Sequence, residues 1–154
     1  MDKIKDVESV ERIIQAPPSA IFDLLADPVK HGEIDGSGTV RAATESSQRL
    51  AMGSTFGMKM KWGIPYKMQS TIIEFETDRV IAWQSWGSIA FMSKFMGGRI
   101  WRYELEAVDG GTLVRESWDI RQERVPALVR PIAKKTIESM TATLERIASI
   151  VESK

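Results

Sequence analysis

A glutamate in the stretch TLVRESWDI, residues 112–120, is the strongest candidate for chemistry in this chain. The stretch is typical of a β-strand, and period-two alternation puts Glu116 on a face that is otherwise mostly apolar. Such a face points inward, where desolvation raises the pKa of a carboxyl group toward neutrality. Glu116 could then orient a ligand hydroxyl or act as an acid or base. The residues that share its face are Thr112, Val114, Trp118 and Ile120.

Arginines offer a second interpretation of the same glutamate. Glu116 could instead form an ion pair at the end of its strand with one of three neighbouring arginines: Arg102, Arg99 or Arg12. Two of these, Arg12 and Arg99, could alternatively anchor a ligand carboxylate, because the planar guanidinium matches that group with two hydrogen bonds. Surface salt bridges are the competing role for both.

The single histidine, His31, is the other candidate acid or base. Its imidazole could serve as a general base or proton shuttle near neutral pH. In the polar turn PVKHGEID it could also be a surface or capping residue. One histidine and no cysteine leave no two-histidine metal site, thiolate metal site or disulfide. We therefore expect no metal and no cofactor.

Aromatic and methionine side chains gather on one face of several expected strands. Methionine adapts to irregular apolar space, and six of the eight methionines fall between Met52 and Met96. These side chains either fill an ordinary core or line a plastic apolar cavity, in which the hydroxyls of Tyr66 and Tyr103 would orient a ligand. The expected lining residues are Phe56, Met58, Met60, Tyr66, Met68, Trp101, Tyr103, Trp118 and Met140.

The elements that must position these residues begin with a strand at 7–15 and a compact segment at 16–38. Ala-Pro-Pro ends the strand, and four apolar residues then form one face of a two-turn helix. Asp27-Pro28 ends that helix, because the residue before proline avoids helical backbone angles. Pro28 can open a second short helix through about Ile34, after which glycines release the chain.

Alternating apolar and polar residues then predict six strands separated by turns, the last two joined by Asp-Gly-Gly at 109–111. This spacing is typical of an antiparallel meander. The inward side of RVIAWQSW stays open between two sets: Ile81 and Trp83, or Ala82, Gln84 and Trp86. The expected strands are 39–44, 54–62, 66–76, 79–86, 99–108 and 112–120.

The chain from about residue 125 returns to a helical period, with Pro126 and Pro131 in the first turns or kinking the helix there. A sheet with a single long helix must lay that helix across one face. If the sheet curls around the helix, space remains between them. The 16–38 segment would then close one end and carry the chain from the first strand to the opposite edge. The apolar helix positions are Val129, Ile132, Ile137, Met140, Leu144, Ile147 and Val151.

The segment GSIAFMSKFMGG, residues 87–98, is too apolar for a loop that faces water. It could fold over the cavity mouth as a lid with glycine hinges. It could instead form a contact with a second copy of the chain in a homodimer. The apolar residues of the expected lid are Phe91, Met92, Phe95 and Met96.

Four stretches follow one another over nearly the whole chain: ERIIQAPPSAIFDLLADPVKHGEIDGSG, IIEFETDRVIAWQSWG, YELEAVDGGTLVRESWD and the amphipathic C-terminal helix. Together they resemble the helix-grip fold of the START/Bet v 1-like (SRPBCC) superfamily, in particular its polyketide cyclase/dehydrase-like proteins. The resemblance implies one α+β domain over 1–154, with a curved antiparallel sheet of about six to seven strands wrapped around the long helix. Ile34 departs from the family, which often has an aromatic residue there.

Composition limits the function classes. Lysine plus arginine equal aspartate plus glutamate at 21 each, and no tight basic run points to nucleic acid. No apolar run is long enough to span a membrane, and MDKIKDVESVER lacks the apolar core of a signal peptide, so we expect a cytoplasmic protein.

The resemblance implies that the protein binds a small hydrophobic molecule, lipid-, polyketide- or aromatic-like, between sheet and helix. Two alternatives stay open. One is an enzyme of the polyketide cyclase or dehydratase type that acts on such a ligand, with Glu116 or His31 as its acid or base. The other is a protein-interaction module that uses the apolar 87–98 segment.

Overall fold

The structure is a computed structural model that describes residues 6–37, 40–43, 49–62, 64–87 and 97–152. These residues form an antiparallel sheet with the strand order β1-β7-β6-β5-β4-β3-β2. Strands β2 to β7 therefore follow the chain order across the sheet, as the predicted meander requires. The strands are β1 (Val7–Ile14), β2 (Val40–Ala43), β3 (Thr55–Trp62), β4 (Ile64–Glu76), β5 (Val80–Gly87), β6 (Gly97–Val108) and β7 (Gly111–Asp119).

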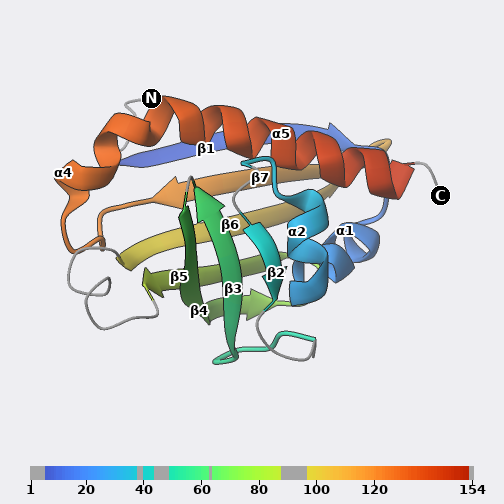
Figure 1. Cartoon of the computed structure of the whole chain (residues 1–154). Coiled ribbons are helices and arrows are strands. Elements are labelled where there is room, and N and C mark those ends of the chain that lie inside the picture. The colour runs from blue at the N-terminus through green and yellow to red at the C-terminus, as the bar shows by residue number, and fades with distance from the viewer. Residues whose placement is uncertain (1–5, 38–39, 44–48, 63, 88–96, 153–154) are drawn as a thin grey trace.

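The segment between β1 and β2 carries the chain from one edge of the sheet to the other. It contains helix α1 (Pro18–Leu25), a 3₁₀ turn η1 (Pro28–Lys30) and helix α2 (His31–Ile34). The Asp27 carboxylate accepts a hydrogen bond of 3.1 Å from the backbone N–H of Val29, which caps the 3₁₀ turn. In Figure 1 both short helices lie at one end of the sheet, as the sequence predicts for this corner.

The C-terminal helix begins later than its periodicity suggests. The structure has a short helix α4 (Pro126–Val129), a 3₁₀ turn η2 (Arg130–Ile132) and only then the long helix α5 (Ala133–Glu152). Pro131 lacks a backbone N–H, and its ring would clash with the carbonyl four residues earlier in a continuous helix. The helix is therefore interrupted at this proline, which is the kinked form of the sequence prediction.

Helix α5 crosses the concave face of the sheet (Figure 1). Its C-terminal half packs into the main apolar core through Leu144, Ile147 and Val151, together with the apolar face of α1. A second cluster joins Trp118 and Ile120 of β7 and the following turn to Val129 and Met140. A curved sheet of seven strands gripping one long helix confirms the helix-grip prediction.

The inward side of β5 is settled by burial. Ile81 is fully buried in the main core, and Trp83 and Ser85 are also buried on the concave side. Gln84 donates a hydrogen bond of 3.0 Å to the backbone carbonyl of Gly98, and the Trp86 ring lies under the guanidinium of Arg124. The inward set is therefore the one that contains Ile81 and Trp83.

The β6–β7 hairpin is tied to the end of β1. Val108 pairs with Gly111 across the Asp-Gly turn, as the sequence predicts. The hydroxyl of Thr112, fully buried, donates a hydrogen bond of 2.7 Å to the backbone carbonyl of Ala16. This bond holds the chain just after β1 against the start of β7.

We expect Thr112→Val to lower the free energy of unfolding by about 1–3 kcal/mol, because the change keeps the shape but leaves the buried Ala16 carbonyl without a donor. Urea unfolding followed by circular dichroism measures this. Thr141→Val is the matched control: its hydroxyl bonds within α5 on the exposed side, so a change within about 0.5 kcal/mol is expected. Equal losses in the two variants would contradict the role given to Thr112.

Candidate functional site

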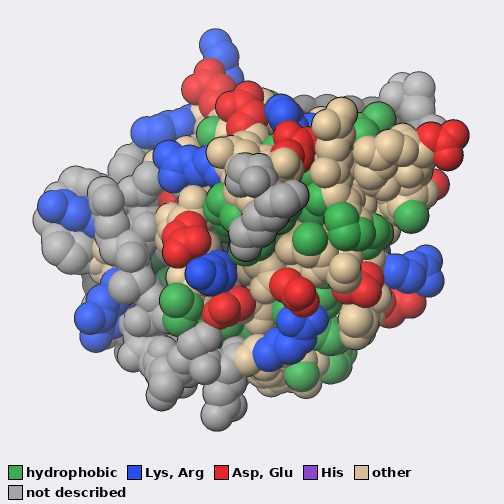
Figure 2. Space-filling model, turned by 90° about the vertical axis from the view of Figure 1, so that its right-hand side faces the viewer, with side chains coloured by type: hydrophobic (Ala, Val, Ile, Leu, Met, Phe, Trp, Pro, Cys, Tyr) green, Lys and Arg blue, Asp and Glu red, His purple; other side chains and the backbone are tan. Residues whose placement is uncertain are grey.

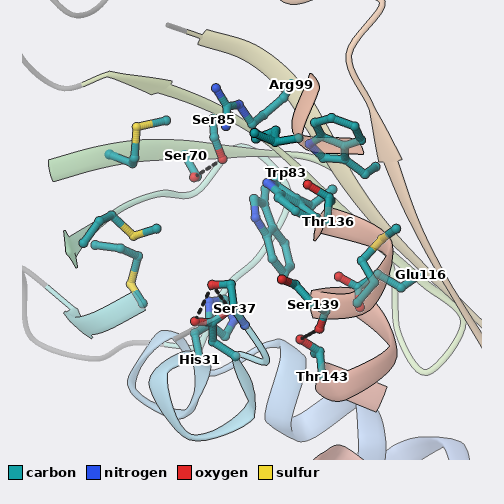
Figure 3. Close-up of a pocket in the computed structure, with 18 of the residues that line it drawn as sticks. His31, Ser37, Ser70, Trp83, Ser85, Arg99, Glu116, Thr136, Ser139 and Thr143 are labelled. Atoms are coloured by element: carbon teal, nitrogen blue, oxygen red, sulfur yellow. Dashed lines mark hydrogen bonds between the residues drawn. The ribbon is translucent and has the colours of Figure 1, made fainter. Parts of the chain in front are cut away.

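A cavity of about 410 Å³ lies between the concave face of the sheet and helix α5. This volume is within the range of pockets that hold small molecules. Its walls come from strands β3 to β7, helix α2, the residues just after it, and the segment from α4 into α5 (Figure 3). Leu128 lines the cavity and is also more than half exposed, so the cavity reaches the surface beside α4.

The structure places every residue of the expected apolar lining on the cavity wall. Strand alternation accounts for eight of them, and the helical period of α5 accounts for Met140. The indole rings of Trp101 and Trp118 lie next to each other with centroids 6.5 Å apart. Whether these residues contact a ligand stays a prediction. The nine residues are Phe56, Met58, Met60, Tyr66, Met68, Trp101, Tyr103, Trp118 and Met140.

His31 is buried, with 6% of its surface exposed, so its interpretation as a surface residue is wrong. Its ring stacks on Trp83 at 5.0 Å between centroids and meets the edge of Phe56 at 5.3 Å. Nε2 lies 2.8 Å from the backbone carbonyl of Leu25, which accepts its hydrogen and leaves Nδ1 as the acceptor nitrogen. Burial lowers the pKa of His31, so the ring is neutral near pH 7. It lines the cavity as part of an aromatic wall.

Glu116 is also buried, with 2% of its surface exposed, and it lines the cavity. In register it lies between Tyr103 on β6 and Val10 on β1. Its Oε1 has no hydrogen-bond partner. Burial raises the pKa of Glu116 to about 8, although a hydrogen bond with the Tyr103 hydroxyl acts in the opposite direction; the negative charge of Asp35 adds to the rise. The carboxyl group is therefore mostly protonated at neutral pH.

The alternative in which an arginine pairs with Glu116 is wrong. Arg102 lies on the other face of β6 and binds Glu74 at 3.1 Å and Glu104 at 3.4 Å. Arg12 is exposed on β1. Successive residues of a strand point to opposite faces, so the alternation that brings Tyr103 inward turns Arg102 outward, away from Glu116.

Arg99 does reach the cavity wall, but it is not a free anchor. Its Nε lies 3.2 Å from Oε2 of Glu123, in an ion pair whose arginine side chain is 13% exposed and whose glutamate side chain is fully buried. Glu123 also accepts a 2.7 Å hydrogen bond from the backbone N–H of Gly97. Arg99 is close enough to Tyr66 to counteract the rise that burial causes in the pKa of that phenol.

The sequence patterns did not predict several polar residues of the cavity wall. Ser70 and Ser85 share a hydrogen bond of 2.7 Å between neighbouring strands, and Ser70 continues the alternation of Tyr66 and Met68, a signal that could have found it. The polar residues of α5 recur with Met140 at helical spacing. The residues after α2 carry no sequence signal, because only the tertiary fold brings them here. The missed polar residues are Asp35, Ser37, Ser70, Ser85, Lys135, Thr136, Ser139 and Thr143.

Three further predictions concern the lid, a metal ion and a membrane span. The expected lid residues Phe91, Met92, Phe95 and Met96 lie outside the described residues. Within the described ranges, no three His, Asp or Glu side chains group in a way that could hold a metal ion. None of the helices in those ranges combines the length and apolar character needed to cross a membrane. Described basic and acidic side chains are interspersed on the face shown in Figure 2.

Comparison with protein families and relatives gives limited functional information. No family model matches the chain. The chain is 35% identical over 108 residues to the uncharacterized protein Rv0088 of Mycobacterium tuberculosis, which covers 69% of this chain and 44% of that relative. The uncharacterized protein MT0096 from another strain of Mycobacterium tuberculosis is 34% identical over 108 residues. The chain thus matches less than half the length of these curated relatives.

Solved structures share the fold over nearly the whole chain. Protein CV1439 from Chromobacterium violaceum has a TM-score of 0.74 at 14% identity, covering 97% of this chain and 99% of its own. A protein from Arthrobacter aurescens has a TM-score of 0.75 at 14% identity, covering 99% and 91%. An AHSA1-like protein from Aeromonas hydrophila has a TM-score of 0.66 at 17% identity, covering 96% and 92%. At these identities the likeness concerns architecture, and the chain has the helix-grip fold.

The raised pKa of Glu116 makes the stability of the fold depend on pH. The folded state holds this proton up to about pH 8, whereas the unfolded chain releases it near 4.5, so the stabilisation is complete below 4.5 and is lost as the pH rises to 8. Between pH 6.5 and 8 we expect the unfolding free energy of the wild type to fall by up to about 1.4 kcal/mol per pH unit relative to Glu116→Gln. Urea unfolding at several pH values measures the difference.

The control for this experiment is Glu106→Gln, which changes an exposed glutamate on β6 and should keep the wild-type pH dependence. His31 has its pKa lowered, so its contribution is lost only as the pH falls below 6.5, outside the chosen window, and it is present in all three proteins. Parallel pH profiles for the wild type and Glu116→Gln would show that Glu116 ionises normally.

Proposed function

We propose that the protein binds a small, largely apolar molecule in the cavity between the sheet and α5. The observation that carries this proposal is the cavity itself. Its volume is about 410 Å³, and it lies between sheet and helix, where side chains would otherwise form a packed core. Protein interiors are normally close-packed, and unfilled apolar walls forfeit dispersion contacts. An occupant with a mostly apolar surface would restore those contacts.

The character of the wall supports an apolar occupant with a few polar groups. Aromatic, methionine and aliphatic side chains together make up most of the described lining, and methionine adapts to ligands of different shapes. The polar groups stand in separate places on the wall: Arg99, Ser70 and Ser85 lie together at one side of the view in Figure 3, away from Glu116 and His31. Such a pattern fixes the orientation of an elongated molecule rather than its mere presence.

Filling the cavity tests this proposal. Thr136 on α5 is buried and lines the cavity, so Thr136→Phe places a ring inside it. We expect the affinity for the neutral fluorescent probe N-phenyl-1-naphthylamine to fall at least about tenfold, because the ring occupies the probe's space. Fluorescence titration measures the dissociation constant.

The matched control is Thr141→Phe, which adds the same ring to the exposed side of the same helix and should leave the affinity unchanged. Circular dichroism confirms that both variants fold. Equal probe affinity in the wild type and both variants, or no saturable binding to the wild type, would count against the cavity as the binding site.

One observation favours an enzyme of the polyketide cyclase or dehydratase type as a second candidate. Glu116 is buried beside Tyr103, and its pKa of about 8 suits a group that donates and accepts protons at neutral pH. On a polyketide-like or aromatic substrate, Glu116→Gln should then abolish turnover while probe binding persists. Unchanged turnover in that variant would remove Glu116 from the mechanism.

The remaining sequence predictions keep that status. An interaction module or homodimer through 87–98 depends on residues 88–96, which lie outside the described part of the chain. A single domain over 1–154, a cytoplasmic location and the absence of a nucleic-acid partner also stay predictions. Limited proteolysis tests the single domain, which matters because the curated relatives are longer than this chain.

A further inference from the structure

Building on the proposed function, we propose that the cavity selects an apolar ligand that carries an uncharged oxygen acceptor, such as a ketone carbonyl, and that the Glu116 carboxyl group donates the hydrogen bond which holds it. Three features of the cavity point to this chemistry: the position of Glu116, the charges around it and the engagement of the neighbouring polar groups within the protein.

Glu116 carries a fully buried polar atom that lacks a hydrogen-bond partner. Its Oε1 is buried and has no partner, whereas the other buried orphan among the described side chains, Nε of Arg102, belongs to a residue that does not line the cavity. A buried polar atom without a partner is destabilising. Since Glu116 faces the cavity beside α5 (Figure 3), a ligand atom can supply the missing partner.

The surroundings of Glu116 favour its neutral form. The titratable groups that act on it are Tyr103 from β6 and Asp35 from the residues after α2, and neither brings a positive charge. Its register partner on β1 is the apolar Val10. On α5 the buried lining residues are uncharged, and Lys135 is exposed.

Arg99, the arginine that lines the described wall, does not change this balance. Arg99 is committed to its ion pair with Glu123. A protonated carboxyl group is a hydrogen-bond donor, and its pKa of about 8 agrees with this state at neutral pH.

Polar groups of the wall near Glu116 are largely engaged within the protein. The Asp35 carboxylate accepts hydrogen bonds of 3.1 Å from the backbone N–H of Ser37 and 2.7 Å from its hydroxyl. The hydroxyls of Ser70 and Ser85 bind each other. A cationic amine beside Glu116 would need that carboxyl group to lose its proton before the group could accept a charge-assisted hydrogen bond. A ligand carboxylate at this end would lie near Asp35, whose negative charge opposes it. An uncharged oxygen acceptor meets neither obstacle.

Three probes of similar size test the inference: 2-acetylnaphthalene, 2-ethylnaphthalene and 2-naphthylethylamine. We measure their dissociation constants at pH 6.5 by tryptophan fluorescence for the wild type, Glu116→Leu and Glu116→Gln. The quantity compared is the affinity of the ketone relative to the hydrocarbon, because this ratio removes the effect of a changed cavity volume. Leucine removes the donor without leaving a buried charge, and glutamine keeps an N–H donor in nearly the same shape.

We expect the ketone-to-hydrocarbon affinity ratio to fall about tenfold in Glu116→Leu and to persist in Glu116→Gln. For the wild type, ketone affinity should also fall about tenfold between pH 7 and pH 9 as Glu116 loses its proton, whereas the glutamine variant should show no such fall. Thermal unfolding of each variant checks that the fold is kept.

The failing outcomes separate the two levels of the proposal. An unchanged ratio in Glu116→Leu, or tightest binding of the amine by the wild type, overturns the inference while the binding function stands. No saturable binding of any probe, the hydrocarbon included, overturns the proposed function and the inference together.

Discussion

The change in character along one face of α5 is the constraint on which the rest of the structure depends. Its C-terminal half presents Leu144, Ile147 and Val151, which pack into the main core and hold the helix on the sheet. Nearer its N-terminus, Met140 packs on Trp118 and Ile120 in the second cluster, and the short polar side chains of Thr136 and Thr143 line the cavity. The helix is therefore held on the sheet by two apolar clusters and presents polar side chains to the cavity.

Closure of the cavity beside α2 depends on a close approach between two backbones. The backbone N–H of Gly36 donates a hydrogen bond of 2.8 Å to the hydroxyl of Thr143. A β-carbon at position 36 would lie only 2.3 Å from the carbonyl oxygen of Ser139, so glycine is required for this contact. Because the loop lies this close to the helix, the neighbouring Asp35 and Ser37 become part of the cavity wall.

The isolation of Glu116 from positive charge follows from the geometry of the sheet. On β6 and β7 alternate residues point to opposite faces, so Arg102 and Arg115 meet Glu74, Glu104 and Glu11 on the outer side. Tyr103 and Glu116 are left together on the inner side. The outer face thus holds a network of paired charges. On the inner face, burial favours the neutral form of the Glu116 carboxyl group, and no positively charged side chain of the described wall forms an ion pair with it.

The sequence by itself determined the strands, the β6–β7 hairpin, the long C-terminal helix and the faces on which Glu116 and the apolar lining stand, because periods of two and 3.6 residues act locally. It could not determine that His31 would stack on Trp83, since that contact joins α2 to a strand far along the chain. The contact of Gly36 with α5 was likewise decided by the tertiary structure. Local patterns assign a face to each residue, whereas the partner across the cavity depends on how distant elements pack.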